Sequence, residues 1–278
     1  MRAKPDSLLR RHPVAAYSIL TFAISWLAAL AVLAPALARP APVAKTIGLI
    51  VFPAMLFGPS ISGILLTWLL DGREGLRELF SRLRRWRVAP RWYGLLLLPP
   101  GLVAAVLLFL KFTISPEFSP NKFYIGFLFG IPAGIFEEVG WTGFAFPKMI
   151  LRRNPLVAAI LLGLLWSLWH LPAINFLGAS APHGPYWLPF FFAFALAMTA
   201  MRVLICWQYA STKSVLLAQL MHISSTGSLV LFSPPVASTQ ETIWYAIYGC
   251  ALWAVVGIIV AKTGRELQSG KRGPAVIT

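Results

Sequence analysis

Two adjacent carboxylates, Glu137 and Glu138, lie deep inside a long apolar stretch of this sequence, within the segment GIFEEVGWTGF. Two histidines, His170 and His222, lie in the middle of two other apolar stretches. An acid or imidazole at such depth in a membrane is costly unless it is paired or faces a water-filled cavity. Because these four side chains come from three separate segments, we expect them to share one cavity.

Glutamate and histidine side chains in one cavity support several kinds of chemistry. A carboxylate can take a proton from water, and an imidazole can share that water or donate to a developing oxyanion. Two histidines and one glutamate also form a common zinc ligand set, here Glu137, His170 and His222. A proton or ion pathway in a transporter uses the same residue types. The residue types alone leave hydrolysis, with or without zinc, and transport open.

The composition indicates an all-α polytopic membrane protein. Of the 278 residues, 58% are hydrophobic and 12% are charged, whereas soluble domains carry about 25% charged residues. The alternating ten-residue segments of a membrane β-barrel are not visible. The net charge of +15 is better explained by basic cytoplasmic segments than by a nucleic-acid partner.

About eight membrane spans are predicted, each near the twenty residues that cross the hydrocarbon core. The predicted spans are Val14–Leu37, Thr46–Leu70, Trp92–Lys111, Phe123–Pro147, Pro155–Leu177, Tyr186–Gln208, Ser214–Phe232 and Thr242–Ala261. With the N-terminus inside, twenty of the 24 Lys and Arg residues fall on the inner side and four on the outer side. This asymmetry predicts cytoplasmic termini.

The predicted organisation is a basic cytoplasmic N-terminus (1–13), one transmembrane domain (14–262) and a cytoplasmic tail (263–278). A single compact membrane domain favours a bacterial plasma membrane as its location. Residues 71–91, DGREGLRELFSRLRRWRVAPR, interrupt the apolar runs, with leucines and aromatic residues at helical spacing between arginines. This pattern predicts an amphipathic connector helix on the inner leaflet. It either gathers membrane-bound substrate or only anchors the fold.

Three segments resemble the ordered motifs of one known family. They are EEVGWTGFAFP at 137–147, LLWSLWHLP at 164–172 and QLMHISSTGS at 219–228. They are similar to the Glu-Glu-x3-Arg, aromatic-x3-His and His-x3-Asn motifs of the CPBP intramembrane proteases. This family is also called the CAAX prenyl protease and bacteriocin-processing, or Abi, family. The resemblance covers roughly residues 46–230, including the connector.

The resemblance implies an intramembrane endopeptidase related to the enzyme that trims prenylated CAAX proteins. In this family pattern Glu137 and His170 would activate the attacking water. His222 and Thr226 would stabilise the oxyanion, and Glu138 would shape the electrostatics of the first motif. Both a zinc-dependent and a metal-free glutamate mechanism are compatible with the resemblance. The implied partners are the lipid bilayer and a membrane-associated peptide or protein substrate, either prenylated or a bacteriocin leader.

Two positions depart from the family pattern. Thr142 replaces the arginine of the first motif and Thr226 replaces the asparagine of the third. An arginine at 142 would lie one helical turn beyond Glu138 and could pair with it. Without it, we expect Glu138 to be protonated or held by hydrogen bonds from other spans. These departures keep a second interpretation open, in which the protein is a catalytically weak relative acting as a membrane scaffold or immunity protein.

Three tryptophans, Trp141, Trp166 and Trp169, flank the candidate residues in the sequence. Tryptophans of membrane proteins commonly serve packing and interfacial anchoring. The alternative is that they form the walls of the cavity and hold an apolar or prenylated chain.

Overall fold

The computed structural model describes residues 8–38, 47–177 and 183–267, and within these residues every regular element is helical. In chain order, the helices from the N-terminal side to α7 are α1 (Leu8–Arg11), α2 (Pro13–Leu37), α3 (Gly48–Met55), α4 (Phe57–Leu83), α5 (Arg91–Gly94), η2 (Leu95–Leu97), α6 (Leu98–Thr113), η3 (Pro116–Phe118), η4 (Tyr124–Phe129) and α7 (Gly130–Gly140). A π-helical turn, η5 (Trp141–Ala145), follows, and then α8 (Phe146–Met149), α9 (Pro155–Trp169), α10 (Leu171–Leu177), η6 (Gly184–Tyr186), α11 (Trp187–Thr212), α12 (Val215–Phe232) and α13 (Ser238–Thr263). The predicted all-α class is confirmed.

Six helical stretches are long and apolar enough to cross a membrane in the described part of the chain. They are Pro13–Pro35, Ile50–Leu83, Arg91–Thr113, Gly184–Thr212, Val215–Phe232 and Ser238–Thr263. The predicted spans 123–147 and 155–177 are each built from consecutive shorter helical segments instead. The chain is therefore an integral membrane protein whose fourth and fifth predicted spans are interrupted. Most of the predicted tail lies outside the described residues, and cytoplasmic termini stay a prediction.

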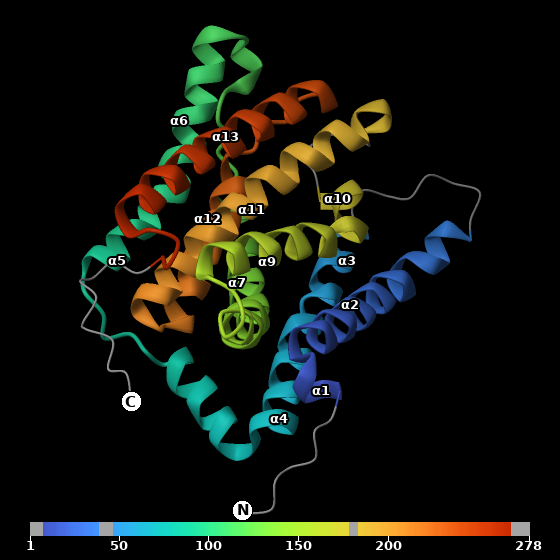
Figure 1. Ribbon diagram of the computed structural model, residues 1–278. Coiled ribbons are helices and arrows are strands. Elements are labelled where there is room, and N and C mark those ends of the chain that lie inside the picture. The colour runs from blue at the N-terminus through green and yellow to red at the C-terminus, as the bar shows by residue number, and fades with distance from the viewer. Residues whose placement is uncertain (1–7, 39–46, 178–182, 268–278) are drawn as a thin grey trace, which may run out of the picture.

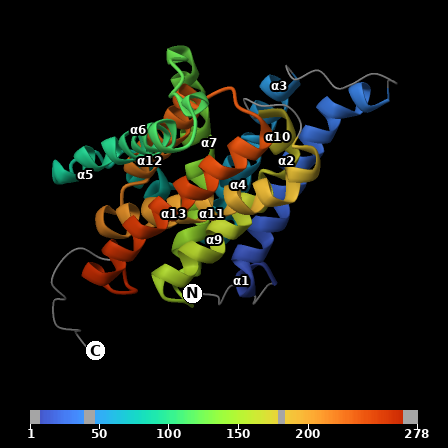
Figure 2. The same cartoon turned by 90° about the horizontal axis from the view of Figure 1, so that it is seen from above.

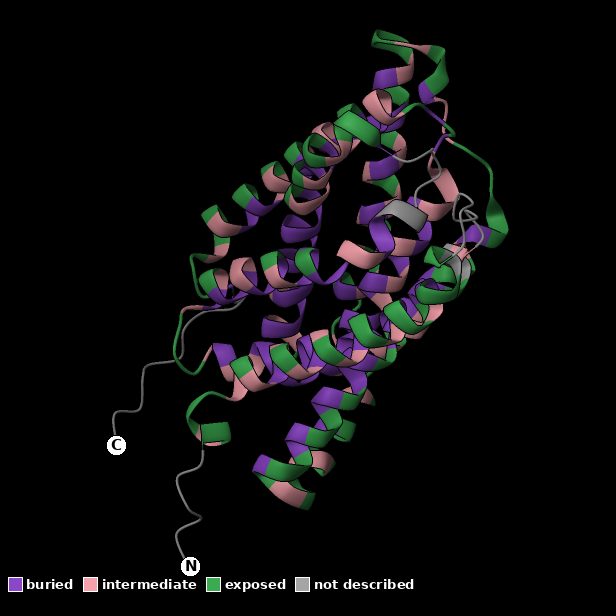
Figure 3. Cartoon of the chain, turned by 90° about the vertical axis from the view of Figure 1, so that its right-hand side faces the viewer, coloured by how far each residue is buried: buried purple, intermediate pink, exposed green. Residues whose placement is uncertain are grey.

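The helices pack around a central group formed by α7, α9, α11 and α12. Helix α11 packs against α9 and α13, and α12 packs against α7 (Figures 1 and 2). Helix α4 joins α7 to α2 on the other side. Buried residues lie mainly on inward helix faces, and many exposed residues on the outer faces (Figure 3) are large and apolar. Apolar outer faces are what a lipid environment requires of membrane-spanning helices.

The connector predicted at 71–91 is helical in its first part and irregular in its second. Helix α4 bends at Gly72, whose φ of 69° and ψ of −154° suit a residue without a Cβ, and it ends at Leu83. The bend forms the V at the bottom of Figure 1. Leu79 is buried while Phe80 is exposed. The connector is tied to the bundle by Arg82, whose Nη1 donates to the hydroxyl of Tyr209 at 2.6 Å.

The interruption after α7 brings the chain into close contact with α4 and α2. A Cβ at Gly140 would lie 2.2 Å from the carbonyl oxygen of Pro59 and 2.4 Å from the hydroxyl of Tyr17. Only glycine permits that approach, so its occurrence here follows from helix packing. The π-helical turn begins at the next residue, Trp141. Such turns inside helical segments are frequent at functional sites.

Candidate active site

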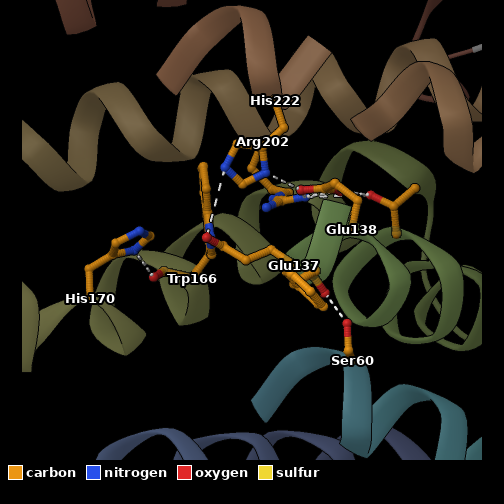
Figure 4. A network of polar contacts seen from close by, with 9 residues as sticks. Ser60, Glu137, Glu138, Trp166, His170, Arg202 and His222 are labelled. Carbon is orange, nitrogen blue, oxygen red and sulfur yellow. Dashed lines mark hydrogen bonds and ion pairs between the residues drawn. The ribbon is translucent and has the colours of Figure 1, made fainter. Parts of the chain in front are cut away.

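The candidate site is assembled from four helices whose ends are defined by local sequence signals. Helix α9 begins after Asn154, whose side chain accepts a hydrogen bond from the backbone N–H of Val157 at 3.0 Å. Helix α12 begins after Ser214, whose hydroxyl accepts from the N–H of Leu217 at 3.1 Å. These caps fix the register of α9 and α12, and thereby the height at which their polar side chains face α7 (Figure 4).

Glu137 on α7 is fully buried. One of its carboxylate oxygens is hydrogen-bonded, and the other is free of hydrogen bonds to the described residues. Its Oε2 accepts a hydrogen bond from Nε1 of Trp166 on α9 at 2.6 Å. Its Oε1 has no hydrogen-bond partner among the described residues and lies 3.9 Å from Nε2 of His222. That separation is too long for a direct hydrogen bond. One oxygen atom at about 2.8 Å from both atoms would bond to each.

Glu138 is held from three sides. Nη1 of Arg202 on α11 donates to Oε1 at 2.9 Å and to Oε2 at 2.8 Å. Nδ1 of His222 on α12 donates to Oε1 at 2.7 Å. The hydroxyl of Thr142, one turn further along the same segment, donates to Oε2. The expectation that other spans hold Glu138 is met by the geometry, and one of them supplies a cationic partner, Arg202, that the sequence motifs do not foresee.

His170 lies at the end of α9, where α10 begins. Its Nδ1 is 2.8 Å from the carbonyl oxygen of Trp166. A carbonyl oxygen only accepts, so Nδ1 carries the hydrogen and the lone pair of the neutral ring is on Nε2. Among the described residues no hydrogen bond or ion pair joins His170 directly to Glu137, so the predicted pair is connected through Trp166.

Trp166 contacts three of the predicted site residues. Besides its bond to Glu137, its ring packs edge-to-face on His170 with centroids 5.2 Å apart and on His222 at 5.1 Å. Cζ of Arg202 lies 4.1 Å from the same ring centroid. A cation over an indole face is attracted to it. Of the two interpretations of the flanking tryptophans, the contacts of Trp166 favour a wall of the site over simple anchoring.

Thr226 is on α12 one turn after His222 and is half-buried. Within the described residues no hydrogen bond links it to Glu137, Glu138 or His222. A metal site is also not formed there, because no three His, Cys, Asp or Glu side chains of the described residues are grouped so as to hold a metal ion. Glu137 Oε2 bonds to Trp166 and His222 Nδ1 bonds to Glu138, which leaves Glu137 Oε1 and His222 Nε2 as the atoms of these two residues that a metal could reach.

The sequence motifs do not predict Arg202 as a site residue. It falls inside the predicted span Tyr186–Gln208, yet the count of basic residues on each side of the membrane treats it as a cytoplasmic residue. Only four ionisable side chains are predicted to lie deep in the membrane, and Arg202 is not among them. Both inferences are wrong for Arg202, which is fully buried in α11. The signal was the apolar run on both sides of it, and in the structure α11 continues to Thr212, four residues past the predicted end of the span.

A second buried polar pair lies away from the site. Nε2 of His183 is 2.8 Å from Oε2 of Glu241, and both side chains are buried. The ring of His183 stacks on Phe190 with centroids 3.8 Å apart. The sequence assigns His183 to a loop and Glu241 to a span end, and neither pattern predicts that the two residues meet.

Comparison with known proteins agrees with the motifs. Residues 119–227 match the protein-family model described as type II CAAX prenyl endopeptidase Rce1-like. The chain is also similar to CAAX prenyl protease 2 of Methanococcus maripaludis, with 32% identity over 134 residues, which are 47% of this chain and 46% of that protein. The chain thus matches about half of the length of this curated relative. The matched region includes Glu137, Glu138, His170 and His222. Residues 119–227 are thus similar to the Rce1-like type II CAAX prenyl endopeptidases.

Proposed function

We propose that this protein is an intramembrane endopeptidase that hydrolyses a peptide bond of a membrane-associated substrate. The observation that carries the proposal is the free Oε1 of the buried Glu137, 3.9 Å from Nε2 of His222. A water or substrate oxygen in that gap would contact a proton acceptor and an imidazole at once. The motifs and the family both support protease chemistry at these residues.

In the proposed reaction Glu137 acts as general base and, together with His170, activates the water. The water oxygen bonds to the substrate carbonyl carbon while its proton passes to the Glu137 carboxylate. His222, protonated on both ring nitrogens so that Nε2 can donate while Nδ1 bonds to Glu138, and Thr226 donate to the carbonyl oxygen as it becomes an oxyanion. The protonated Glu137 then gives its proton to the leaving amine as the C–N bond breaks. Each step uses side chains of this chain.

Glu138 has a supporting role in this scheme. It accepts a hydrogen bond from Nδ1 of His222 at 2.7 Å, which fixes the orientation of that ring. A histidine whose Nδ1 is hydrogen-bonded in this way presents Nε2 to the reacting atoms. Carboxylates orient histidine rings in the same way in other sites. The pairing of Glu138 with Arg202 supplies the compensating charge that a buried carboxylate requires.

Two observations support a choice of substrate class. The relative from Methanococcus maripaludis is named a CAAX prenyl protease, and the rings of Trp166, Trp169 and Phe194 pack against His170 in the site. A prenylated peptide ending in Cys-a-a-X is therefore the first substrate that we propose. A bacteriocin leader peptide is the alternative that the wider family suggests.

The test is cleavage of both peptides by purified protein in bilayers. We expect the wild type to cleave the prenylated reporter. Glu137→Gln should lower kcat by at least about a hundredfold, because general-base catalysis contributes about 10²–10⁴. Glu117→Gln, a change of the same kind at an exposed surface glutamate, is the matched control and should cleave normally. Full cleavage by Glu137→Gln, or no cleavage of either peptide by well-folded wild type, would contradict the proposal and favour the scaffold interpretation.

The question of a metal is tested with the same reporter. Because the described residues form no three-ligand group, we expect cleavage to survive prolonged dialysis against a zinc chelator. Activity that is lost on dialysis and restored by adding zinc would show that the reaction depends on zinc. That result would require the candidate ligands to move closer together than they lie in the structure.

A further inference from the structure

Arg202 is a cation in an apolar membrane helix, and its position calls for a reason. It is fully buried in α11. A buried ion loses its hydration, and the loss is offset only by good pairing and hydrogen bonding. Its Nε and Nη2 have no hydrogen-bond partner among the described residues. The guanidinium is therefore engaged mainly through one nitrogen, Nη1.

The contacts of Arg202 all lead to groups that contact the candidate catalytic residues. Nη1 bonds to both carboxylate oxygens of Glu138, and Glu138 in turn holds His222. The guanidinium lies over the ring of Trp166, whose Nε1 holds Glu137. In the described part of the chain, no hydrogen bond or ion pair joins Arg202 to Glu137 itself. Its direct contacts with the site therefore run through Glu138 and Trp166.

Arg202 and Thr142 share one small volume. Nη1 of Arg202 is 3.4 Å from Oγ1 of Thr142, and both atoms bond to Glu138. An arginine at position 142, as in the family motif, would bring its own guanidinium into this volume and compete with Arg202. The short threonine side chain leaves the room that the guanidinium from α11 occupies.

The packing of α9 on α11 is adapted to this arrangement. A Cβ at Gly163 on α9 would lie 2.7 Å from Cα of Thr199 and 3.2 Å from Cβ of Arg202. The glycine thus lets the two helices approach until the guanidinium reaches the face of Trp166, which is three residues further along α9. Helices in membranes use small residues for such close approaches.

We infer that Arg202 is a positioning residue of the active site, which supplies from α11 the positive charge that the first motif of the family supplies from position 142. It fixes Glu138, and through Glu138 and Trp166 it orients His222 and Glu137. This inference rests on the proposed function, because its effect on catalysis requires that Glu137 and His222 act on the substrate.

The inference is tested by moving the charge back to the motif position. Arg202→Met removes the cation and should lower kcat toward the prenylated reporter by about tenfold or more, with KM changed less. Arg202→Lys should retain more activity than Arg202→Met, because an ammonium can replace the bonds of Nη1 but not the stacking of the guanidinium on Trp166. The double variant Thr142→Arg with Arg202→Met should recover kcat relative to Arg202→Met.

A second double variant separates charge balance from positioning. Glu138→Gln with Arg202→Met removes both charges, so its melting temperature should recover relative to Arg202→Met while kcat stays low. Arg202→Met with kcat within twofold of wild type would overturn the inference. So would a Thr142→Arg, Arg202→Met variant that folds but remains as slow as Arg202→Met.

Melting temperatures keep the inference testable where activity is weak. Arg202→Met should melt below wild type because Glu138 is left unpaired, and Thr142→Arg should restore the melting temperature in that background. Absence of this restoration would also overturn the inference. Failure of the proposed function is recognised separately, by a Glu137→Gln variant that still cleaves.

Discussion

The indole Nε1 of Trp166 donates a hydrogen bond to Oε2 of Glu137 at 2.6 Å, and both side chains are buried. This bond leaves Oε1 as the only free oxygen of that carboxylate among the described contacts. A hydrogen bond to a charged group contributes about 1.5–3 kcal/mol, which corresponds to about 10- to 100-fold in rate if it is lost in the transition state. Trp166→Phe keeps the ring and removes the donor, and we expect kcat to fall by about that factor.

Trp169 offers a matched control for this change. Its side chain is equally buried, its ring packs on His170 with centroids 4.8 Å apart, and its Nε1 has no partner within the described residues. Trp169→Phe should therefore leave kcat within about twofold, since no hydrogen bond is lost. Steady-state cleavage of the reporter measures both variants. Equal losses in the two would mean that ring packing, and not the bond to Glu137, is what matters.

The tautomer of His170 gives a second prediction. Its Nδ1 donates to the carbonyl oxygen of Trp166 at 2.8 Å, so Nε2 is the nitrogen available for the reaction. An asparagine amide can replace the Nδ1 donor but has no atom at the position of Nε2. We expect His170→Asn to lower kcat by about a hundredfold or more while the melting temperature changes little.

Glutamine at position 170 provides the comparison for that variant. Its longer side chain can place an amide near the position of Nε2 but loses the local bond to the Trp166 carbonyl. It should be less stable than His170→Asn and not more active. An active His170→Asn variant would remove His170 from the reaction.

The site residues differ in how far the sequence predicts them. Glu137, Glu138 and His222 stand out because an ionisable side chain deep in an apolar run has few explanations other than pairing or function. Arg202 obeys the same rule, but it lies near the predicted end of a span, where arginine is common on the cytoplasmic side. The ambiguity disappears only when α11 is seen to continue to Thr212.

Contacts between helices are what the sequence leaves open. The bond between Trp166 and Glu137 joins residues 29 positions apart, and the pair of Arg202 and Glu138 joins residues 64 apart. Periodicity places a side chain on a helix face but does not say which helix faces it. The breaks at the π-helical turn and between α9 and α10 are hidden for a related reason. A span is predicted from the total length of an apolar segment, and that length is the same whether or not the helical hydrogen bonding changes within the segment.

The arginines of the connector give a third prediction, which decides between its two interpretations. Arg77, Arg84, Arg85 and Arg87 line a hollow of about 680 Å³ together with Phe80, Ser81 and Trp86. Burial lowers the pKa of Lys213 beside the connector, and the positive charge of the neighbouring Arg82 lowers it further. Arg84→Gln with Arg85→Gln should weaken cleavage of a prenylated reporter in anionic vesicles, mainly through KM, and have less effect in zwitterionic vesicles.

The control for the connector variants is Arg152→Gln with Arg153→Gln. These two arginines are also adjacent and exposed, and they lie in the turn before α9. If the connector gathers substrate, the control should retain a lower KM than the connector variant at equal net charge. Equal effects of the two double variants would show that only overall charge matters, and the connector would then be an anchoring element.

The close approach of Gly140 to Pro59 and Tyr17 gives the last prediction. A methyl group at this position would overlap the Pro59 carbonyl oxygen at 2.2 Å, and that oxygen belongs to backbone that cannot move without displacing α4. Overpacking of this kind costs about 1–3 kcal/mol or more. Because Glu137 and Glu138 lie on the same segment just before Gly140, α7 can relieve the overlap only by shifting both carboxylates. Gly140→Ala should therefore lower both the melting temperature and kcat.

Gly101 on α6 is the matched position, because a Cβ there would meet no atom within 4 Å. In a helix alanine is favoured over glycine by up to about 1 kcal/mol, so Gly101→Ala should melt at the same temperature as wild type or higher and cleave normally. A Gly140→Ala variant that melts and cleaves like Gly101→Ala would mean that α4 and α7 can separate freely. The position of the two carboxylates would then not depend on this helix contact, and the enclosed site would have to be held by the polar contacts of Glu137 and Glu138 alone.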